Sequence, residues 1–161
     1  MPAQESATHP IDIGSVFRRD VISIEPDADI GTAARLMREK HVGYLIVTEP
    51  ATEAGPGRVV GVLTDRDIVV TVVAREAEPR SLKVADVMTR NPLLVGEDGS
   101  IDATLGFMRD AGVRRVPVVG PRGELKGVLS VDDVLARMAR QLTNIAGSFQ
   151  IEQRSEKVTR P

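Results

Sequence analysis

The chain has 161 residues, of which 42% are hydrophobic and 27% charged, and its formal net charge is -2 at pH 7. That length suits one ordinary domain or two small repeats that share a core. Only 2% of the residues are aromatic and basic residues are not in excess, so neither base stacking nor phosphate attraction is supported and no nucleic-acid partner is expected.

The sequence contains no cysteine, which excludes disulfides, thiolate metal sites and cysteine nucleophiles. It has no apolar run of about 18 residues, so no membrane span is expected. Residues 1–10 are polar and lack the basic start and apolar stretch of a secretory signal, and we interpret them as a disordered leader. The default expectation is a cytoplasmic location.

The first half of the chain opens with a strand, a helix and a second strand. After one helical turn at 13–17, residues 21–24 predict a short strand, and Asp27 or Asp29 is expected to cap the helix that follows. The apolar face of that helix is predicted from its spacing to comprise Ile30, Ala33, Ala34, Met37 and His41. Residues 43–47 predict a strand that is buried on both faces.

A loop at 49–57 leads to a further strand at 58–63, and a helix is predicted from Asp65. The side chains that this helix is expected to bury are Ile68, Val69, Val72 and Val73. A polar linker at 76–81 contains Pro79. It marks the predicted boundary between a first unit at 11–78 and a second unit at 79–140.

The second half repeats the pattern of the first. Ile101 and Met108 follow Ile30 and Met37 at a constant offset of 71 (101 − 30 and 108 − 37). At Gly127 against Gly61 the offset is 66 (127 − 61), because the loop of the first half is five residues longer than the turn at 120–123. A constant register that is broken once, at a loop, indicates a duplicated unit.

Each unit therefore predicts an α/β (α+β) fold in the order β-α-β-β-α. The first two strands are joined through a helix and should be parallel, whereas the next two are joined by a turn and should be antiparallel. A three-stranded sheet with both helices on one face leaves its other face bare. Two such units, each too small to be stable alone, are expected to pack face to face in pseudo-two-fold symmetry.

After Val131 a helix is predicted through Val134, Leu135 and Met138, followed by a C-terminal extension at 141–161 that is partly helical and interrupted at 147–148. The apolar positions of the extension are Leu142, Ile145, Phe149 and Ile151. They have no obvious partner within either repeat. Two alternatives stay open: the extension packs on another subunit, or it folds back on its own body.

The most informative stretch is Gly61–Asp67 (GVLTDRD), which returns as Gly127–Asp133 (GVLSVDD). Each copy places a hydroxyl and a carboxylate three positions apart at the start of a helix. This pattern matches a capping box in its acidic variant. It equally suits a polyol-phosphate ligand, since a carboxylate accepts two hydrogen bonds from a cis-diol and a helix N-terminus favours phosphate.

Taken together, these features resemble a tandem pair of cystathionine-beta-synthase (CBS) domains, known as a Bateman module. The resemblance covers about residues 11–140 and rests on the duplicated motif, on VPVV at 116–119 and on DVMT at 86–89. It implies a stand-alone, non-catalytic regulatory module that binds an adenosine-type ligand such as AMP, ADP, ATP or S-adenosylmethionine between the repeats. No further cofactor is implied.

The resemblance also assigns roles to residues. In such proteins the motif aspartate binds the ribose hydroxyls, and the motif hydroxyl with nearby basic groups binds phosphate. For the motif positions this implies Thr64, Asp65, Arg66 and Asp67 in one cleft, and Ser130, Asp132 and Asp133 in the other. For the adenine it implies contacts with Ile22 and Ser23 or Leu93 and Leu94, and with Tyr44 or Arg115, Val116 and Pro117.

Arg114 and Arg115 are further candidates for charge-assisted hydrogen bonds to phosphate. The second motif has Asp132 where the first has Arg66, so an acid replaces a base. We therefore expect two unequal sites, with the cleft of Thr64 and Asp67 better suited to a phosphate.

The alternative function is a ligand-free structural or interaction module whose motif residues only cap helices. Tandem pairs of this kind are expected to form a homodimer through the helices of the repeats and possibly the C-terminal extension. No metal site is expected, because the adjacent aspartates do not converge on one ion. An enzyme is the weakest hypothesis, since His9 lies in the leader and His41 has no acid nearby in the sequence.

Overall fold

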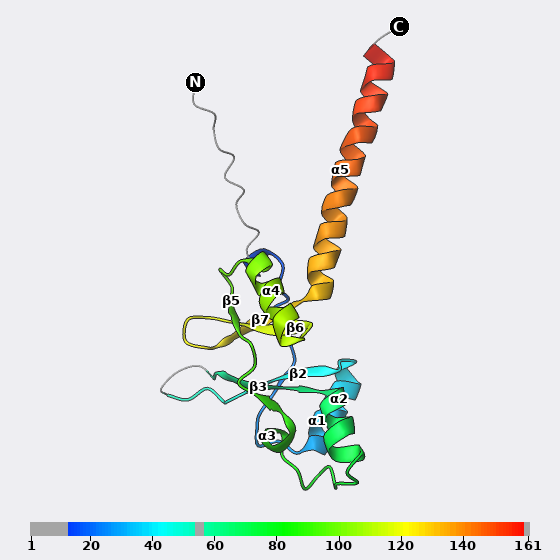
Figure 1. Cartoon of the computed structure of the whole chain (residues 1–161). Coiled ribbons are helices and arrows are strands. Elements are labelled where there is room, and N and C mark those ends of the chain that lie inside the picture. Colours follow the sequence, from blue (N-terminus) through cyan, green and yellow to red (C-terminus); the bar gives the residue numbers. More distant parts are fainter. Residues whose placement is uncertain (1–12, 54–56, 160–161) are drawn as a thin grey trace.

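The computed structural model describes residues 13–53 and 57–159, with side chains described up to residue 147 (Figure 1). Two small units of sheet and helix lie one above the other, and a long C-terminal helix projects from the upper unit. The predicted α/β class and the pseudo-two-fold packing of two repeats are confirmed. The predicted leader at 1–10 lies outside the described residues.

The first sheet has the predicted strand directions. β1 (Ser23–Ile24) is parallel to β2 (Tyr44–Thr48), and β2 is antiparallel to β3 (Val59–Thr64). α1 (Ile30–Lys40) connects the parallel pair. A fourth strand that the sequence did not predict, β4 (Thr89–Arg90), is contributed by the second half of the chain and pairs with β3.

The second sheet repeats this arrangement. β5 (Val95–Gly96) is parallel to β6 (Arg115–Val119), which is antiparallel to β7 (Leu125–Ser130), and α4 (Ile101–Ala111) connects the parallel pair. The register shifts after Val47 in the first sheet and after Val118 in the second, again 71 residues apart (118 − 47). The duplication therefore extends to an irregularity of the backbone.

The leading turns of the two repeats are exchanged between the cores. The turn η1 (Ile13–Ser15) buries Ile13, and Phe17 after it, in the core of the second unit. Conversely, α3 (Val84–Val87) and Met88 contribute to the core of the first unit. Neither core is complete without a segment from the other half of the chain, so the two repeats fold as one body.

The motif glycines allow this exchange. A Cβ at Gly61 would lie 2.5 Å from the Met88 sulfur, and a Cβ at Gly127 would overlap the Phe17 ring and the Arg18 carbonyl oxygen. The backbones of Arg18 and Val128 exchange two hydrogen bonds, each of 2.9 Å. Only glycine leaves room for the exchanged segment to pass so close to the strand.

The structure of α1 shows which of the two predicted caps is used. It also shows that two positions predicted to be buried are exposed. Asp29 is the cap: it accepts the Thr32 N–H at 2.9 Å and the Thr32 hydroxyl at 2.7 Å, and these bonds lower the pKa of its carboxyl. Asp27 instead pairs with Lys83. Ala34 and His41, predicted on the buried face, are exposed; His41 ends the helix in the left-handed conformation with φ 54°.

The helix after β3 also differs from its prediction. α2 (Asp65–Ile68) continues as the π-helix η2 (Val69–Val73), where the Ala74 N–H reaches the Val69 carbonyl. The wider turn shifts the spacing of the buried face away from 3.6 residues. Val72 is buried as predicted, but Val69 and Val73 are 55% and 63% exposed.

α5 (Val131–Thr159) is one continuous helix, so the predicted interruption at 147–148 is wrong. It buries Val134 but exposes Leu135 and Met138. Beyond the body the helix projects freely, and the fold-back alternative is therefore wrong (Figure 1). The side chains of Phe149 and Ile151 lie outside the described part. Among the described helices, none has the length and apolar character needed to cross a membrane.

The exchanged turn yields a test of the fold. Ile13 is fully buried in the core of the opposite repeat, so Ile13→Ala should lower the free energy of unfolding by about 2–4 kcal/mol in urea titrations. Phe107→Ala is the control: that side chain is larger but 56% exposed, and a loss below about 1 kcal/mol is expected. Similar losses in both variants would contradict the exchange.

Candidate functional site

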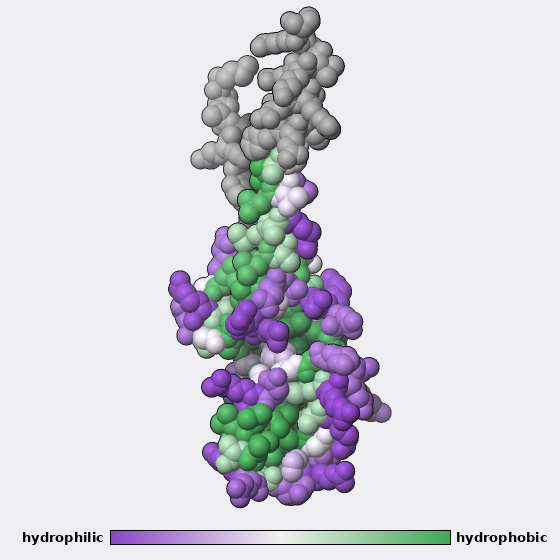
Figure 2. All heavy atoms as spheres, turned by 90° about the vertical axis from the view of Figure 1, so that its right-hand side faces the viewer, coloured by the Kyte–Doolittle hydropathy of each residue, from purple (hydrophilic) through white to green (hydrophobic). Residues whose placement is uncertain are grey.

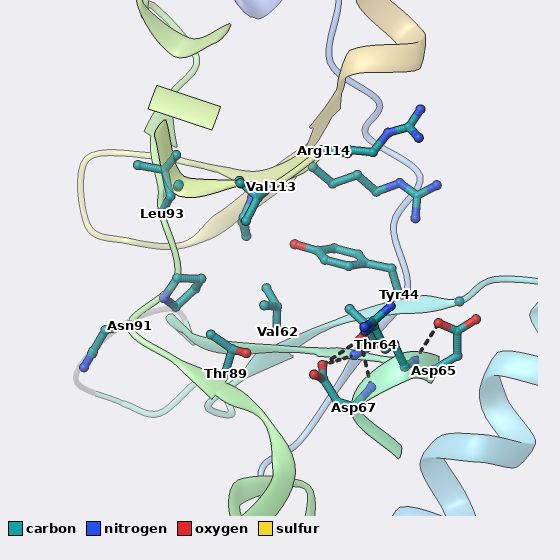
Figure 3. Close-up of a pocket in the computed structure, with 17 residues that line it drawn as sticks. Tyr44, Val62, Thr64, Asp65, Asp67, Thr89, Asn91, Leu93, Val113 and Arg114 are labelled. Atoms are coloured by element: carbon teal, nitrogen blue, oxygen red, sulfur yellow. Dashed lines mark hydrogen bonds between the residues drawn. The ribbon is translucent and has the colours of Figure 1, made fainter. Parts of the chain in front are cut away.

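A cleft of about 740 Å³ lies between the two units, on the side of the first motif (Figure 3). This volume is within the usual range for small-molecule sites of about 300–1,000 Å³. The first unit contributes Gly43, Tyr44, Val62 and residues 64–67 to its lining. The chain between the repeats contributes residues 89, 91–93, and the second unit contributes residues 111–115 and 117.

The structure gathers nine of the residues named from the sequence around this one cleft. They are Tyr44, Thr64, Asp65, Arg66, Asp67, Leu93, Arg114, Arg115 and Pro117. The other candidates do not line it: Ser130, Asp132 and Asp133 belong to the second motif, and Ile22, Ser23, Leu94 and Val116 lie elsewhere. The sequence analysis did not identify Val62, Thr89, Asn91 and the stretch 111–113. Contacts between segments far apart in the chain bring these residues to the cleft, and such contacts leave no local pattern in the sequence.

The capping box predicted for the first motif is present. The Asp67 N–H donates to Thr64 Oγ1 at 3.1 Å, and Asp67 Oδ2 accepts both the Thr64 N–H at 2.8 Å and the Thr64 hydroxyl at 2.7 Å. All of these bonds use one carboxylate oxygen. Asp67 Oδ1 has no hydrogen-bond partner among the described residues, so capping the helix leaves an acceptor available on the cleft wall.

Tyr44 stands in the middle of the cleft, with Val62 on one side and Arg114 on the other (Figure 3). Its hydroxyl is buried and has no hydrogen-bond partner within the described chain. Burial raises the pKa of Tyr44, and the nearby charge of Arg115 opposes this only in part. A buried hydroxyl without a partner costs free energy, so a bound molecule that supplied one would recover it.

Basic and acidic groups face each other across the cleft. The arginines come from the start of β6, and the Arg115 guanidinium lies 6.0 Å from the centre of the Tyr44 ring. Asp65 and Asp67 lie on the opposite wall at the start of α2 (Figure 3). A ligand with an anionic group at one end and hydroxyl groups at the other would match this distribution of charge.

The second motif has a similar cap but differs in its partners. Ser130 Oγ accepts the Asp133 N–H at 3.1 Å and donates its own proton to Asp133 Oδ2. The remaining oxygen, Asp133 Oδ1, lies 3.5 Å from Nε of Arg18. Arg18 occupies the position that corresponds to Thr89 in the first cleft (89 − 18 = 71). Both carboxylate oxygens of Asp133 are therefore engaged.

Asp132 adds to the difference between the motifs. Its Oδ1 lies 3.0 Å from Arg114 Nη2, so an arginine that lines the first cleft is tied to the acid of the second motif. Within the described residues, no three His, Asp or Glu side chains converge as a metal site would require. The first cleft is lined by arginine and aspartate side chains, which are donors and acceptors for a polar organic molecule.

The chain was compared with known proteins. The sequence profile of the family described as CBS domain matches residues 13–74 and 84–140. The protein MK0525 of Methanopyrus kandleri is 31% identical over 125 residues, which cover 78% of this chain and 61% of that protein. YlbB of Bacillus subtilis is 34% identical over 116 residues, which cover 72% and 73% of the two chains.

A solved structure shows the same fold. The CBS domain pair of protein MJ0100, crystallised with 5′-methylthioadenosine and S-adenosyl-L-methionine, is 20% identical in sequence with a TM-score of 0.68. The match covers 82% of this chain and 98% of that one.

The cap of α2 can be tested apart from any ligand. Thr64→Ala removes the acceptor of the Asp67 N–H, and we expect a loss of about 1 kcal/mol in the free energy of unfolding. Thr64→Ser is the matched control because it keeps the hydroxyl, and its loss should be clearly smaller. If both variants lost the same stability, the packing of the Thr64 methyl group would be responsible and not the cap.

The environment of Tyr44 yields a pH prediction. It is the single tyrosine of a chain without tryptophan, so tyrosinate absorbance reports this residue alone. Since burial raises its pKa in the folded state, Tyr44 should keep its proton at pH values where the unfolded chain has lost it. Its contribution to stability is then complete below the ordinary pKa of about 10 and is lost as the pH rises through the folded value. Identical titrations of the folded and urea-unfolded chain would contradict the burial.

Proposed function

The chain belongs to the CBS domain family, with two copies of the domain in tandem, and from this premise we propose that it is a non-catalytic regulatory module for an adenosine-type ligand. The observation that carries the proposal is the state of Asp67: one carboxylate oxygen takes part in the cap of α2, and the other has no hydrogen-bond partner in the described part of the chain and lies on the wall of a cleft of about 740 Å³. A ribose presents two adjacent hydroxyls, which a carboxylate accepts well.

The apolar lining offers a place for the base. Val62, Leu93 and Val113 line the middle of the cleft and come from different segments of the chain (Figure 3). The Tyr44 ring adds an aromatic surface, and the hydroxyl at its tip has no partner among the residues that the structure describes. An adenine held between these side chains would bury its faces against carbon and gain a hydrogen bond at its edge. The adenosyl ligands in the MJ0100 pair support this assignment by similarity of fold.

The charges favour a ligand that carries phosphate. Three arginines, Arg66, Arg114 and Arg115, line the cleft against two aspartates, Asp65 and Asp67. The lining thus carries one net positive charge (3 − 2), and Arg114 and Arg115, at the start of β6, lie on the wall opposite Asp65 and Asp67 (Figure 3). We propose AMP, ADP or ATP as the preferred ligands over the cationic S-adenosylmethionine, because a guanidinium binds phosphate with charge-assisted hydrogen bonds.

The second motif is proposed to bind more weakly or not at all. A ligand there would have to displace Arg18 from Asp133 and would meet Asp132 where the first cleft has Arg66. The alternative function, a ligand-free interaction module, is favoured by a different observation: the capping box is already complete and explains both motif residues by itself. The two functions predict opposite results in a binding experiment.

Titration with AMP, ADP, ATP and S-adenosylmethionine tests the proposal, with calorimetry and the fluorescence of the single tyrosine as readouts. Asp67→Ala should weaken binding of the best nucleotide at least about tenfold, which corresponds to about 1.4 kcal/mol. Asp133→Ala is the matched control and should weaken it less than about threefold. Circular dichroism must first show that Asp67→Ala, which also loses the cap, is folded at the temperature used.

Two results would count against the proposal. A ligand at about 1 mM half-fills a site even when its Kd is as weak as 1 mM. If no nucleotide gave a response at that concentration, the ligand-free module would explain the data better. If Asp67→Ala and Asp133→Ala weakened binding equally, the inequality of the two sites would be wrong, although ligand binding itself would stand.

A further inference from the structure

The three arginines that line the first cleft differ in their partners. Arg114 Nη2 donates a hydrogen bond of 3.0 Å to Asp132 Oδ1. Arg115 faces the Tyr44 ring, and neither it nor Arg66 forms an ion pair within the described part of the chain. Of these three cations, Arg114 is therefore the one whose charge is matched by an acid of the chain itself.

The fold of the second repeat places Asp132 beside Arg114. The Val131 N–H donates to the Arg114 carbonyl oxygen at 3.0 Å, so α5 begins next to the start of β6. The first repeat has the same backbone hydrogen bond, of 3.1 Å, to the carbonyl oxygen of Gly43. There Gly43 corresponds to Arg114 (114 − 43 = 71), and Arg66 corresponds to Asp132 (132 − 66 = 66). The duplicated backbone therefore does not require the ion pair, which belongs to the second repeat alone.

The ion pair of Arg114 and Asp132 is open to water. The two side chains are 76% and 59% exposed. On the face shown in Figure 2, hydrophilic residues lie between the apolar area of the lower unit and the apolar residues along α5. An exposed pair of this kind changes an equilibrium by a factor of about five or less, so a bound anion can replace the carboxylate. Asp132 does not line the cleft, and it therefore affects a ligand through Arg114 and not by contact.

We propose that Asp132 is a specificity-determining residue of the first cleft, because it competes with the phosphate of a ligand for Arg114. This role rests on the proposed function and sets how strongly the cleft distinguishes a nucleotide from the uncharged nucleoside. A phosphate binds a guanidinium through two oxygens, so it has to take Arg114 from the carboxylate. Adenosine has no phosphate and leaves the pair intact. The pair therefore weakens the binding of AMP relative to that of adenosine.

Calorimetry with adenosine and AMP tests the competition in the full chain. Asp132→Asn removes the charge of the acid and keeps the size of the side chain. AMP should bind this variant about two- to fivefold more tightly than it binds the parent, as release of an exposed ion pair allows. The Kd of adenosine should change less than about 1.5-fold, since no charged group of that ligand meets Arg114.

Asp110→Asn is the matched control for the loss of one negative charge. Asp110 also pairs with an arginine at 3.0 Å, Arg109, and its side chain is 68% exposed. It directly precedes Ala111, which lines the cleft, but Arg109 does not line it. At about 0.15 M salt, where charges are screened beyond about 8 Å, this variant should change the Kd of AMP less than about 1.5-fold. An equal gain in both variants would show a general effect of charge and would overturn the competition.

Arg114→Gln completes a double-mutant cycle. With no arginine left to release, Asp132→Asn in the Arg114→Gln background should change the Kd of AMP less than about 1.5-fold. The same gain in the presence and in the absence of Arg114 would show that Asp132 acts at a distance, and the competition would be wrong.

The proposed function and the competition fail in different ways. If neither adenosine nor AMP bound the parent or Asp132→Asn, the proposed function would be wrong and the competition with it. If AMP bound the parent and Asp132→Asn with the same Kd, nucleotide binding would stand and the competition would be wrong. Equal tightening of adenosine and AMP would show a structural effect of the substitution and would also exclude the competition.

Discussion

The structure depends on the exchange of the two leading turns. Ile13 and Phe17 complete the core of the second repeat, and Val84 and Met88 complete the core of the first. Each repeat alone would be small and would leave apolar surface open to water, because a shorter chain buries a smaller fraction of its surface on folding. The exchange makes folding of one half conditional on the other, and it fixes the two walls of the cleft relative to each other.

The duplicated motif meets two demands at once. Its glycine is required because the exchanged segment passes within contact of the strand, as the Cβ positions at Gly61 and Gly127 demonstrate. Its hydroxyl and carboxylate then cap the helix that follows. The motif can serve both as a helix cap and as a ligand site, because the cap uses only one carboxylate oxygen of Asp67. A residue that stabilises the fold can therefore also present an acceptor to the cleft.

Pseudo-symmetry in the fold does not make the two sites equal. Thr89 and Arg18 occupy corresponding positions, yet only Arg18 places a charge beside a motif aspartate. Asp132 in turn holds Arg114, which lines the other cleft. Through these two ion pairs the second motif neutralises its own acids and tethers an arginine of the first. Such exposed pairs are weak, about 1 kcal/mol or less each, so a strongly bound anion could rearrange them.

The sequence by itself determined the family, the duplication, the strand directions and nine of the residues that line the cleft, because each of these rests on local spacing or on a motif. Only the tertiary structure decided which repeat each leading turn completes, which face of the π-helix is buried and whether α5 continues past Gly147. It also brought Thr89, Asn91 and Val113 to the cleft. These features arise from contacts between residues far apart in the chain. The spacing of apolar residues along the sequence does not show which segment will cover a given helix or strand face, so it could not predict them.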